Sequence, residues 1–424
     1  MMPRRVVITG LGAVTPIGND VETTWKSLVA GRSGIGRITT FAPDSYAVQI
    51  GGMVKDFDLL PYLPDPRRAR HLSRAAGFGV AAAIQALRDA GVGPDTYEPH
   101  EQGISMGGSA GRPELEEMAE ILHVQHASEG RRLVRHSPRN VLRREQNSAI
   151  AVIAELACLE GPVIGISTAC SGSAHAIGEA FRRVQDGEAK LMLAGGYDAL
   201  TTYLDVLGFA LLGALNTSYN DRPEAASRPF ERDRAGFVIG EGGVAAVLED
   251  WDSARARGAP ILAEIVGYGS SLNAYRITDS PPDGSGPILA MRNALQESGL
   301  RAEDIDYIVA HGTGTAGNDR SETIAIKQVF GPHAYQLAVS SPKSMTGHLT
   351  IAAGGLNLLA ALGAISHQVV PPTINYENPD PKLDLNYVPN TAQQRRVRAV
   401  MLNAFAFGGT NASMVVRSAD DAAG

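Results

Sequence analysis

Cys170 is the residue whose sequence context most strongly indicates chemistry. It lies in the run Gly165-Ile-Ser-Thr-Ala-Cys-Ser-Gly-Ser-Ala-His175, where a strand-like apolar segment meets small residues and then apolar residues at helical spacing. This pattern predicts a cysteine at the N-terminus of a helix, where the helix dipole lowers the pKa of the thiol. A buried structural cysteine is the alternative. The other cysteine, Cys158, lies on an apolar helix face and is expected in the core.

Two of the ten histidines follow apolar segments and lie in loops rich in glycine and threonine. His311 lies in Val309-Ala-His-Gly-Thr-Gly-Thr315, and His348 lies in Ser340-Ser-Pro-Lys-Ser-Met-Thr-Gly-His348. Loops that follow strands are where α/β proteins place their chemistry. A metal site is the weaker interpretation, because no carboxylate completes a ligand pattern at helical spacing.

Lys343 precedes His348 by five residues, and two acidic residues, Asp319 and Glu322, follow His311. A buried lysine needs a counter-charge. We therefore expect these two carboxylates to anchor Lys343.

The last glycine-rich loop is Asn403-Ala-Phe-Ala-Phe-Gly-Gly-Thr-Asn411. Gly408 and Gly409 allow an unusual backbone path, so main-chain N–H groups can point at a ligand. Phe407 beside them is suited to gate a pocket. A tight turn between two strands is an equally good interpretation of this segment alone.

The elements that must position these residues alternate between short β-branched segments followed by glycine and segments of helical period, which is typical of an α/β protein. Strands are expected at Val6–Thr9, Gly103–Met106, Val163–Ser167, Leu191–Ala194, Val244–Glu249, Ile261–Tyr268, Ile305–Ala310, Ala338–Ser341, Val400–Ala406 and Ser413–Arg417, and helices at Arg70–Ala90, Arg112–His123, Gln146–Leu159, Ser171–Asp186, Gly286–Ser298, Arg320–Phe330 and Thr350–His367. The order of the elements repeats loosely, which suggests a duplication with domains 1–255 and 256–424.

Composition excludes several classes of protein. The chain has 424 residues, of which 44% are hydrophobic and 20% charged, and its net charge is −7. These values exclude disorder, and the acidity argues against nucleic-acid or anionic-membrane binding. Two cysteines exclude a disulfide framework. The longest apolar stretch, Ile351–Ile365, falls short of the roughly 20 residues of a spanning helix, and the N-terminus does not resemble a signal peptide. We expect a cytoplasmic protein.

Together the motifs resemble those of the β-ketoacyl-[acyl carrier protein] synthases. They are TACSGS around Cys170, HGTGT around His311, KSMTGH ending at His348, VPPTIN at 370–375 and FGGTN at 407–411. The match runs from VVITGLGAVTPIG at the start to MVVR near the end, and it fits the Cys-His-His branch of synthases II and type II polyketide ketosynthases. The resemblance implies a thiolase fold, an α/β fold of two duplicated βαβαβαββ halves in five layers, α-β-α-β-α, that works as a dimer.

The resemblance also implies a reaction. Cys170 would be the nucleophile that takes an acyl chain from an acyl carrier protein, with backbone N–H groups of Cys170 and Phe407 as the oxyanion hole. His311 and His348, both neutral and donating Nε2–H, would stabilise the enolate formed when malonyl loses CO₂. That enolate would attack the thioester and extend the chain by two carbons. Lys343 would be a further catalytic group.

Other residues take supporting roles by the same resemblance. Glu322 and Asp319 would support the electrostatics of the site, and Phe407, Gly408 and Gly409 would form a gate. The pantetheine arm would hydrogen-bond to Thr313 and Thr315, and the acidic carrier protein would dock on Arg67, Arg68, Arg70 or Arg135, for which an ordinary solvated surface is an equal alternative. No metal or cofactor is implied, because the substrates are carried on the phosphopantetheine arm.

Two segments depart from the elongating fatty-acid synthases. The segment Pro138–Asn147 is rich in arginine where those synthases tend to have an apolar, proline-rich run, and Asn273 stands where they often carry an aspartate. The runs 160–163 and 318–323 are more similar to those of polyketide ketosynthases. We therefore expect a type II polyketide ketosynthase paired with a homologous chain-length-factor-like subunit. The alternative is a homodimeric fatty-acid elongation synthase II.

Other classes fit less well. A thiolase needs a second catalytic cysteine near the C-terminus, and synthase III uses Cys-His-Asn. A dinucleotide-binding oxidoreductase would need a third glycine after Gly10 and Gly12. A non-catalytic chain-length subunit would replace the nucleophile with glutamine, and Cys170 argues against it.

Overall fold

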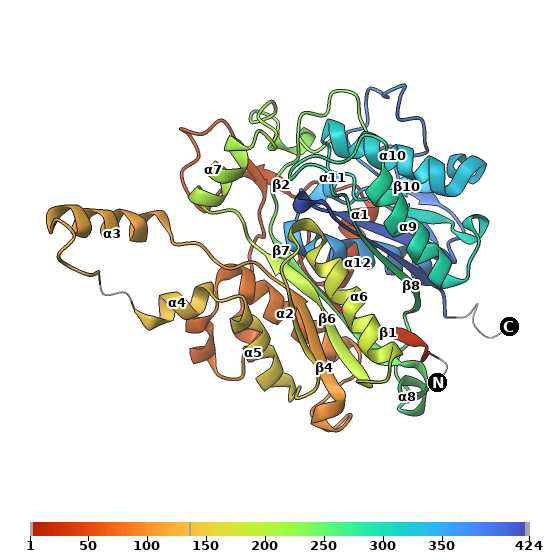
Figure 1. Ribbon diagram of the computed structural model, residues 1–424, viewed down its shortest axis with the longest axis horizontal. Helices are drawn as coiled ribbons and strands as arrows, with labels where there is room; N and C mark the ends of the chain where they lie inside the picture. Colours follow the sequence, from red (N-terminus) through yellow and green to blue (C-terminus); the bar gives the residue numbers. More distant parts are fainter. Residues whose placement is uncertain (1–2, 135–136, 420–424) are drawn as a thin grey trace.

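The computed structural model describes residues 3–134 and 137–419, and its centre is a mixed ten-stranded sheet flanked by helices (Figure 1). The strands are β1 (Val6–Val14), β4 (Gln102–Gly107), β5 (Val163–Ile166), β6 (Leu191–Asp198), β7 (Gly242–Asp250), β8 (Ala263–Leu272), β9 (Tyr307–Val309), β10 (Ala338–Ser340), β13 (Ala399–Phe405) and β14 (Thr410–Arg417). All ten predicted strands are confirmed, with ends that differ by a few residues. Two short antiparallel pairs lie outside this sheet: β2 (Ile35–Arg37) with β3 (Ile50–Gly52), and β11 (Val369–Val370) with β12 (Gln393–Gln394).

The seven predicted helices are also present, and further helices were missed. The helices are α1 (Val21–Val29), α2 (Arg74–Asp89), α3 (Leu115–Ala127), α4 (Pro138–Arg144), α5 (Asn147–Ala157), α6 (Gly172–Gln185), α7 (Tyr203–Leu211), α8 (Trp251–Ala256), α9 (Ser285–Ser298), α10 (Ala316–Phe330), α11 (Lys343–Thr346) and α12 (Ala353–His367). The sequence did not reveal α1, α4, α7, α8 and α11, because each spans fewer than ten residues and gives too few turns for a clear helical period.

The sheet repeats one topology twice. Its strand order is β10-β9-β13-β14-β8-β1-β7-β6-β4-β5. When the strands are numbered within each half, both sets of five have the order 3-2-4-5-1 across the sheet. Strands 3, 2 and 4 pair in parallel, and strand 5 pairs antiparallel with both strand 4 and strand 1. The halves join where β1 pairs with β8 over three residues.

Three apolar clusters show that the protein has five layers, α-β-α-β-α. Along β6, Leu191 and Leu193 pack under α2 and α5, whereas Met192 and Ala194 pack on α6 and α12. A third cluster lies between the second half of the sheet and helices α9 and α10. Helices α6 and α12 therefore form the middle layer, between the two five-stranded halves of the sheet. The predicted thiolase-like α/β fold is confirmed.

Glycines allow the outer helices to lie directly on the strands. A Cβ atom on Gly12 of β1 would come within 2.0 Å of the carbonyl oxygen of Ala82 in α2. In the second half, a Cβ atom on Gly269 of β8 would come within 2.1 Å of the carbonyl oxygen of Ala290 in α9. The same close packing therefore occurs at matching positions of both halves.

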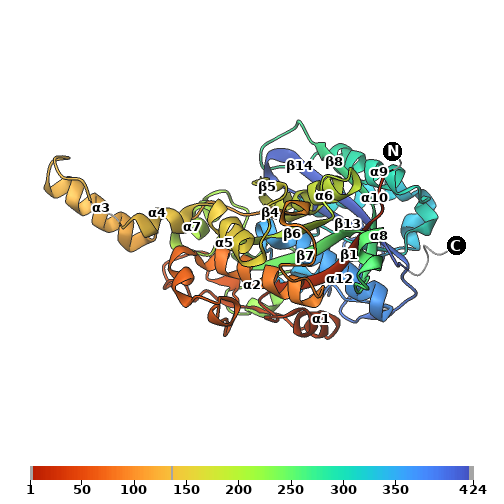
Figure 2. The same cartoon turned by 90° about the horizontal axis from the view of Figure 1, so that it is seen from below.

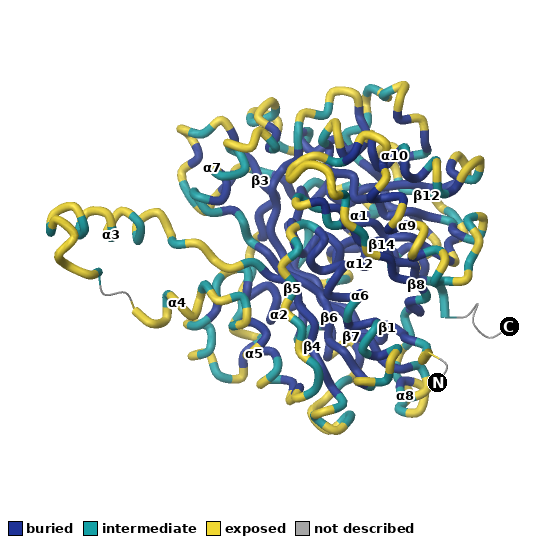
Figure 3. Tube along the Cα trace, in the orientation of Figure 1, coloured by how far each residue is buried: buried dark blue, intermediate teal, exposed yellow. Residues whose placement is uncertain are grey.

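Helices α3 and α4, with the described residues 111–134 and 137–146, form an arm that extends away from the body (Figures 1 and 2). Neither helix has a buried residue, and the arm is mostly exposed in Figure 3. It nevertheless carries exposed Leu122, Leu133, Val141 and Leu142. Helices without a buried face gain little from packing within their own chain.

Two expectations about individual segments need comment. Cys158 is exposed and caps the C-terminus of α5 in the left-handed conformation, with φ of +53°, so the prediction that it lies in the core is wrong. Periodicity placed it on an apolar face, but the helix ends one residue earlier and turns it outward. The segment Thr350–His367 is apolar and long enough to cross a membrane, yet 83% of it is buried as a core segment.

We predict that Gly12→Ala and Gly269→Ala each lower the free energy of unfolding by about 1–3 kcal/mol, because the new methyl group would push a helix off the sheet. Chemical denaturation measures the change. Gly93→Ala is the control, since that exposed glycine has no atom within 4 Å of a new Cβ. Equal stabilities for all three variants would contradict the close packing.

Candidate active site

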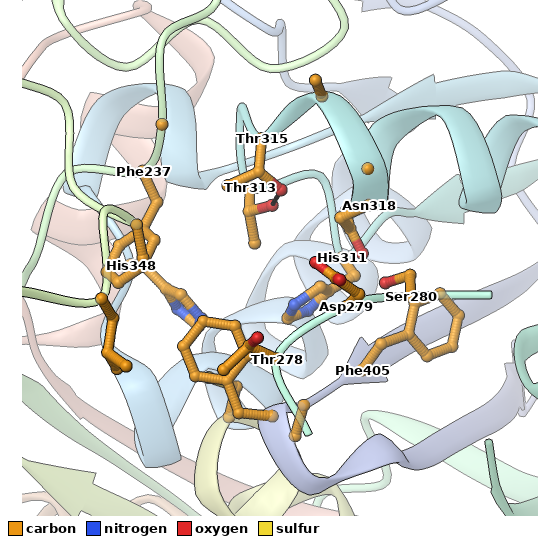
Figure 4. A pocket seen from close by; sticks show the side chains of 18 of the residues that line it. Phe237, Thr278, Asp279, Ser280, His311, Thr313, Thr315, Asn318, His348 and Phe405 are labelled. Atoms are coloured by element: carbon orange, nitrogen blue, oxygen red, sulfur yellow. Dashed lines mark hydrogen bonds between the residues drawn. The ribbon is translucent and has the colours of Figure 1, made fainter. Parts of the chain in front are cut away.

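Cys170, His311 and His348 line one pocket of about 400 Å³. Figure 4 shows the two histidine rings directed toward the same space, with Thr313 and Thr315 above them. Each of the three residues follows a strand of the central sheet. Cys170 follows β5, His311 follows β9, and His348 follows β10 and α11.

The turn that presents Cys170 is strained. Ala169, the residue before it, has φ of +46°, where residues other than glycine are uncommon. Such conformations cost about 1–3 kcal/mol and cluster at functional sites. Ser171 supports the turn, because its hydroxyl donates to the carbonyl of Thr168 at 2.8 Å and lies 2.9 Å from the hydroxyl of Thr410. Helix α6 begins at Gly172, so Cys170 does lie at a helix N-terminus.

The thiol is less acidic than the sequence suggested. Burial raises the pKa of Cys170 to about 11, and the nearby charge of Lys343 only partly offsets this. The expectation of a lowered pKa is therefore wrong, because removing the sulfur from water outweighs the helix dipole. Backbone N–H groups of Phe407 and Cys170 itself also approach the sulfur and lower its pKa. These are the two N–H groups expected to form an oxyanion hole.

Both histidines are neutral. They are 4% and 2% exposed, and their ring centroids lie 5.4 Å apart at an angle of 81°. Burial lowers the pKa of His311 and of His348 well below the ordinary value, and the positive charge of Lys343 lowers both further. A neutral imidazole donates one hydrogen bond and accepts one.

The protein fixes the tautomer of His348. Its Nδ1 accepts a hydrogen bond from the backbone N–H of Thr350 at 3.2 Å. The ring proton must therefore be on Nε2, which has no partner among residues 3–134 and 137–419. Over the same residues, Nδ1 of His311 has no partner. His348 thus offers a free N–H donor at the pocket.

Lys343 is buried without a direct ion pair. It is 1% exposed, and its Nζ has no hydrogen-bond partner in the described part of the chain. Burial lowers the pKa of Lys343, and the charge of Glu322 partly restores it. The expected anchoring by Glu322 therefore acts through the electric field and not through contact.

The two carboxylates of α10 instead hold the loop that carries His311. Glu322 accepts the backbone N–H groups of His311 and Gly312, each at 2.8 Å, and Asn403 donates to it at 3.1 Å. Asp319 accepts the N–H of Thr313 at 3.1 Å. Both side chains lie in the first two turns of α10 and face this loop, which is why they meet backbone donors.

The predicted gate is tied to a neighbouring loop. Gly408 and Gly409 have φ of +83° and +80°, conformations that glycine adopts without strain. The N–H of Gly408 donates to the carbonyl of Ile277 at 2.7 Å, and the N–H of Asn273 donates to that of Gly409 at 2.8 Å. Phe407 lines the pocket. The loops at 273–279 and 407–409 therefore form one hydrogen-bonded unit.

The remaining predicted residues lie at the pocket wall or at the surface. The hydroxyls of Thr313 and Thr315 lie 2.9 Å apart on the wall (Figure 4). The three arginines of the turn Pro66–His71 differ: Arg67 pairs with Asp65 at 2.9 Å, Arg68 pairs with Glu155, and Arg70 contacts His71. Arg135 lies outside the described residues.

Sequence reasoning missed several residues of the pocket. Phe237 packs edge-on against His348 at 5.4 Å, and Phe405 lies 5.6 Å from His311. Asp198 is buried nearby and influences the thiol. Only Phe405, two residues before Phe407, had a sequence signal, because it shares the last glycine-rich motif. No group of three or more His, Cys, Asp or Glu in the described residues could hold a metal ion.

Two family models match this chain. The Beta-ketoacyl synthase N-terminal domain matches residues 3–254, and the Beta-ketoacyl synthase C-terminal domain matches residues 262–377. The two matches together cover most of the sequence.

Similar proteins are known over the whole length. A 3-oxoacyl-[acyl-carrier-protein] synthase 2 from Synechocystis is 45% identical over 415 residues, 98% of both chains. The ishigamide ketosynthase/chain length factor has a TM-score of 0.87 and 35% identity, covering 98% of this chain and 99% of that one. A type II polyketide ketosynthase in complex with its acyl-carrier protein, bound to the hexaketide, has a TM-score of 0.86 and 32% identity, covering 98% and 100%.

These similarities bear on the expected pathway. The curated synthase 2 relative is more similar in sequence than either polyketide ketosynthase. The comparisons therefore favour the fatty-acid synthase alternative over the polyketide interpretation.

We predict that Lys343→Met slows alkylation of Cys170 by iodoacetamide at mildly alkaline pH. Lys343 lowers the pKa of the thiol, so its loss raises that pKa and leaves less thiolate. Intact-mass measurement in a Cys158→Ala background follows Cys170 alone. Lys26→Met, which removes a charge from the exposed face of α1, is the control. Unchanged or faster alkylation in Lys343→Met would show that Lys343 does not act on the thiol.

Proposed function

This chain belongs to the beta-ketoacyl synthase family and is an acyltransferase of the 3-oxoacyl-[acyl-carrier-protein] synthase type, and we propose that it is a fatty-acid elongation synthase II. One observation carries this proposal. Cys170 shares one pocket with two buried, neutral histidines, His311 and His348. A thiol nucleophile and two uncharged N–H donors are the groups that decarboxylative condensation requires.

Loading begins the reaction. The sulfur of Cys170 attacks the acyl thioester of the carrier protein, and the backbone N–H groups of Cys170 and Phe407 stabilise the tetrahedral oxyanion. The carrier's thiol leaves with the proton that Cys170 loses. One thioester replaces another, so the step needs little driving force and no further reactant.

Condensation follows with malonyl on the carrier protein. The thioester oxygen of malonyl accepts hydrogen bonds from His311 and His348, and loss of CO₂ leaves an enolate that these donors stabilise. The enolate carbon attacks the acyl group on Cys170, and the carbon–sulfur bond breaks. Neutral rings suit this step, because an imidazolium would protonate the carbanion early.

The carrier protein is the proposed macromolecular partner. The hydroxyls of Thr313 and Thr315 line the pocket and suit hydrogen bonding to a pantetheine arm. For docking we propose Arg67 and Arg70, together with the exposed Arg139 and Arg143 of α4, which packs against the turn 66–71. Basic side chains fit the acidic surface of a carrier protein. We place the enzyme in the cytoplasm, where its carrier-bound substrates are made.

We further propose a homodimer. Val163 of edge strand β5 is 66% exposed, and the arm formed by α3 and α4 carries exposed leucines. Edge strands and exposed apolar patches mark interaction surfaces. A heterodimer with a chain-length-factor-like subunit is the second candidate, favoured by the similarity to a ketosynthase/chain length factor.

We predict that Cys170→Ala abolishes acyl loading, and that Cys170→Gln decarboxylates malonyl-carrier protein without condensing it. Intact-mass measurement after incubation with acyl-carrier protein follows loading, and CO₂ release follows decarboxylation. Cys158→Ala is the matched control, because it removes the other, exposed thiol. Loading of the Cys170→Ala variant would exclude this nucleophile.

We predict that His311→Ala and His348→Ala each abolish CO₂ release while part of the acyl loading survives, because the oxyanion hole for loading is made of backbone N–H groups. The exposed His123→Ala is the control. Normal CO₂ release in both active-site variants would refute the enolate-stabilising role.

We predict that the wild-type chain has a native mass of two chains and that Val163→Lys shifts it toward one. A charge on a pairing edge strand costs desolvation energy on association. Tyr335→Lys, at an exposed aromatic residue on the other half of the molecule, should leave the mass unchanged. A wild-type monomer would favour the heterodimer.

A further inference from the structure

Asp198 is a buried carboxylate that forms no ion pair with any residue of the described chain. It ends β6 and is 0% exposed. Its Oδ1 accepts from the hydroxyl of Ser109 at 2.6 Å and from the N–H of Ala199 at 3.0 Å, and its Oδ2 accepts from the hydroxyl of Thr350 at 2.5 Å and from the N–H of Ile351 at 3.4 Å. Burying an unpaired charge is costly. The reaction steps above do not use this residue.

Thr350 links Asp198 to His348. It has φ of +48°, an outlier for a β-branched side chain. Its hydroxyl donates to Asp198, while its backbone N–H donates to Nδ1 of His348 at 3.2 Å. The left-handed conformation at Thr350 accompanies both bonds. Without an anchor for the hydroxyl, this residue would relax toward an ordinary conformation and withdraw its N–H.

We propose that Asp198 is a positioning residue for decarboxylation: by holding Thr350 in its left-handed conformation, it keeps the proton of His348 on Nε2. This proposal rests on the proposed function, because the proposed decarboxylation needs the proton of His348 on Nε2. With the proton on Nε2, His348 meets the malonyl oxygen as a hydrogen-bond donor. With the proton on Nδ1, the same ring would present a lone pair to that oxygen and repel it.

A second effect of Asp198 gives an independent signature. Its negative charge raises the pKa of the Cys170 thiol. This effect depends on the charge of Asp198 and not on its hydrogen bond to Thr350. Removing the charge should therefore make Cys170 more reactive toward an alkylating agent while the decarboxylation becomes slower.

Two substitutions separate the hydrogen bond from the charge. Thr350→Val removes the hydroxyl and leaves the charge of Asp198 in place. Asp198→Asn removes the charge. Each carboxylate oxygen of Asp198 accepts a backbone N–H, from Ala199 or from Ile351, so the NH₂ group of the asparagine would face an N–H donor in either orientation. Thr350→Ser keeps the hydroxyl and is the conservative variant.

The experiment measures CO₂ release from malonyl-carrier protein, alkylation of Cys170, and the ¹⁵N shifts of His348, assigned with His348→Ala. We expect Asp198→Asn and Thr350→Val to lose about ten- to a hundredfold in CO₂ release, the loss usual when a residue that orients a metal-bound histidine is removed. Thr350→Ser should stay near the wild-type rate. Alkylation should quicken in Asp198→Asn and stay unchanged in Thr350→Val.

The control is Asp250→Asn, which alters another buried aspartate. Asp250 is the N-cap of α8 and lies at the other end of the strands from Asp198. It should change neither CO₂ release nor the His348 shifts. A His348 that keeps its Nε2 proton in both test variants would overturn the proposal, as would normal CO₂ release in both. A wild-type protein that releases no CO₂ would instead refute the proposed function, while the ¹⁵N shifts would still test the tautomer.

Discussion

Burial is the largest influence on the ionisation of Cys170, His311, His348 and Lys343. Burial raises the pKa of the Cys170 thiol and lowers those of His311, His348 and Lys343. Burial thereby favours the uncharged form of each histidine and the protonated form of the thiol. Lys343 contributes mainly through its field, because no carboxylate touches its ammonium group within the described residues. The hydrogen bonds of Glu322 and Asp319 are spent on the backbone of the His311 loop.

The duplicated topology explains how these groups meet. β5 and β10 are the third strands of the two halves, and each occupies the outer edge of its half-sheet. The segment after β5 carries Cys170, and the segment after β10 carries Lys343 and His348. Equivalent positions of the two related halves therefore supply Cys170 and His348, whereas His311 follows β9, the second strand of its half. The middle layer of α6 and α12 brings the two ends together, and the matching glycine contacts at Gly12 and Gly269 show the same repeat in the packing.

Much of this could be predicted from sequence, because the relevant signals are local. All ten strands of the central sheet followed from short apolar segments, several of them beside a glycine, and Cys170, His311 and His348 stood in motifs next to those strands. The acidity of Cys170 could not be predicted, since the helix N-terminus is encoded nearby while the burial comes from segments hundreds of residues away. Asp198 and Phe237 reach the site only through the fold and have no motif of their own. Cys158 was misplaced because periodicity cannot tell the last helical residue from the cap that follows it.

The arm of α3 and α4 links assembly to folding. Neither α3 nor α4 has a buried residue within the described chain, so a second chain in the proposed dimer would add the packing that they lack. In a dimer, mass action then makes the stability of this region depend on protein concentration. In that dimer, a newly made subunit would expose Leu122, Leu133 and Leu142 until it met its partner. The solubility of the unassembled chain, and not only its catalytic rate, therefore constrains how this arm can change in sequence.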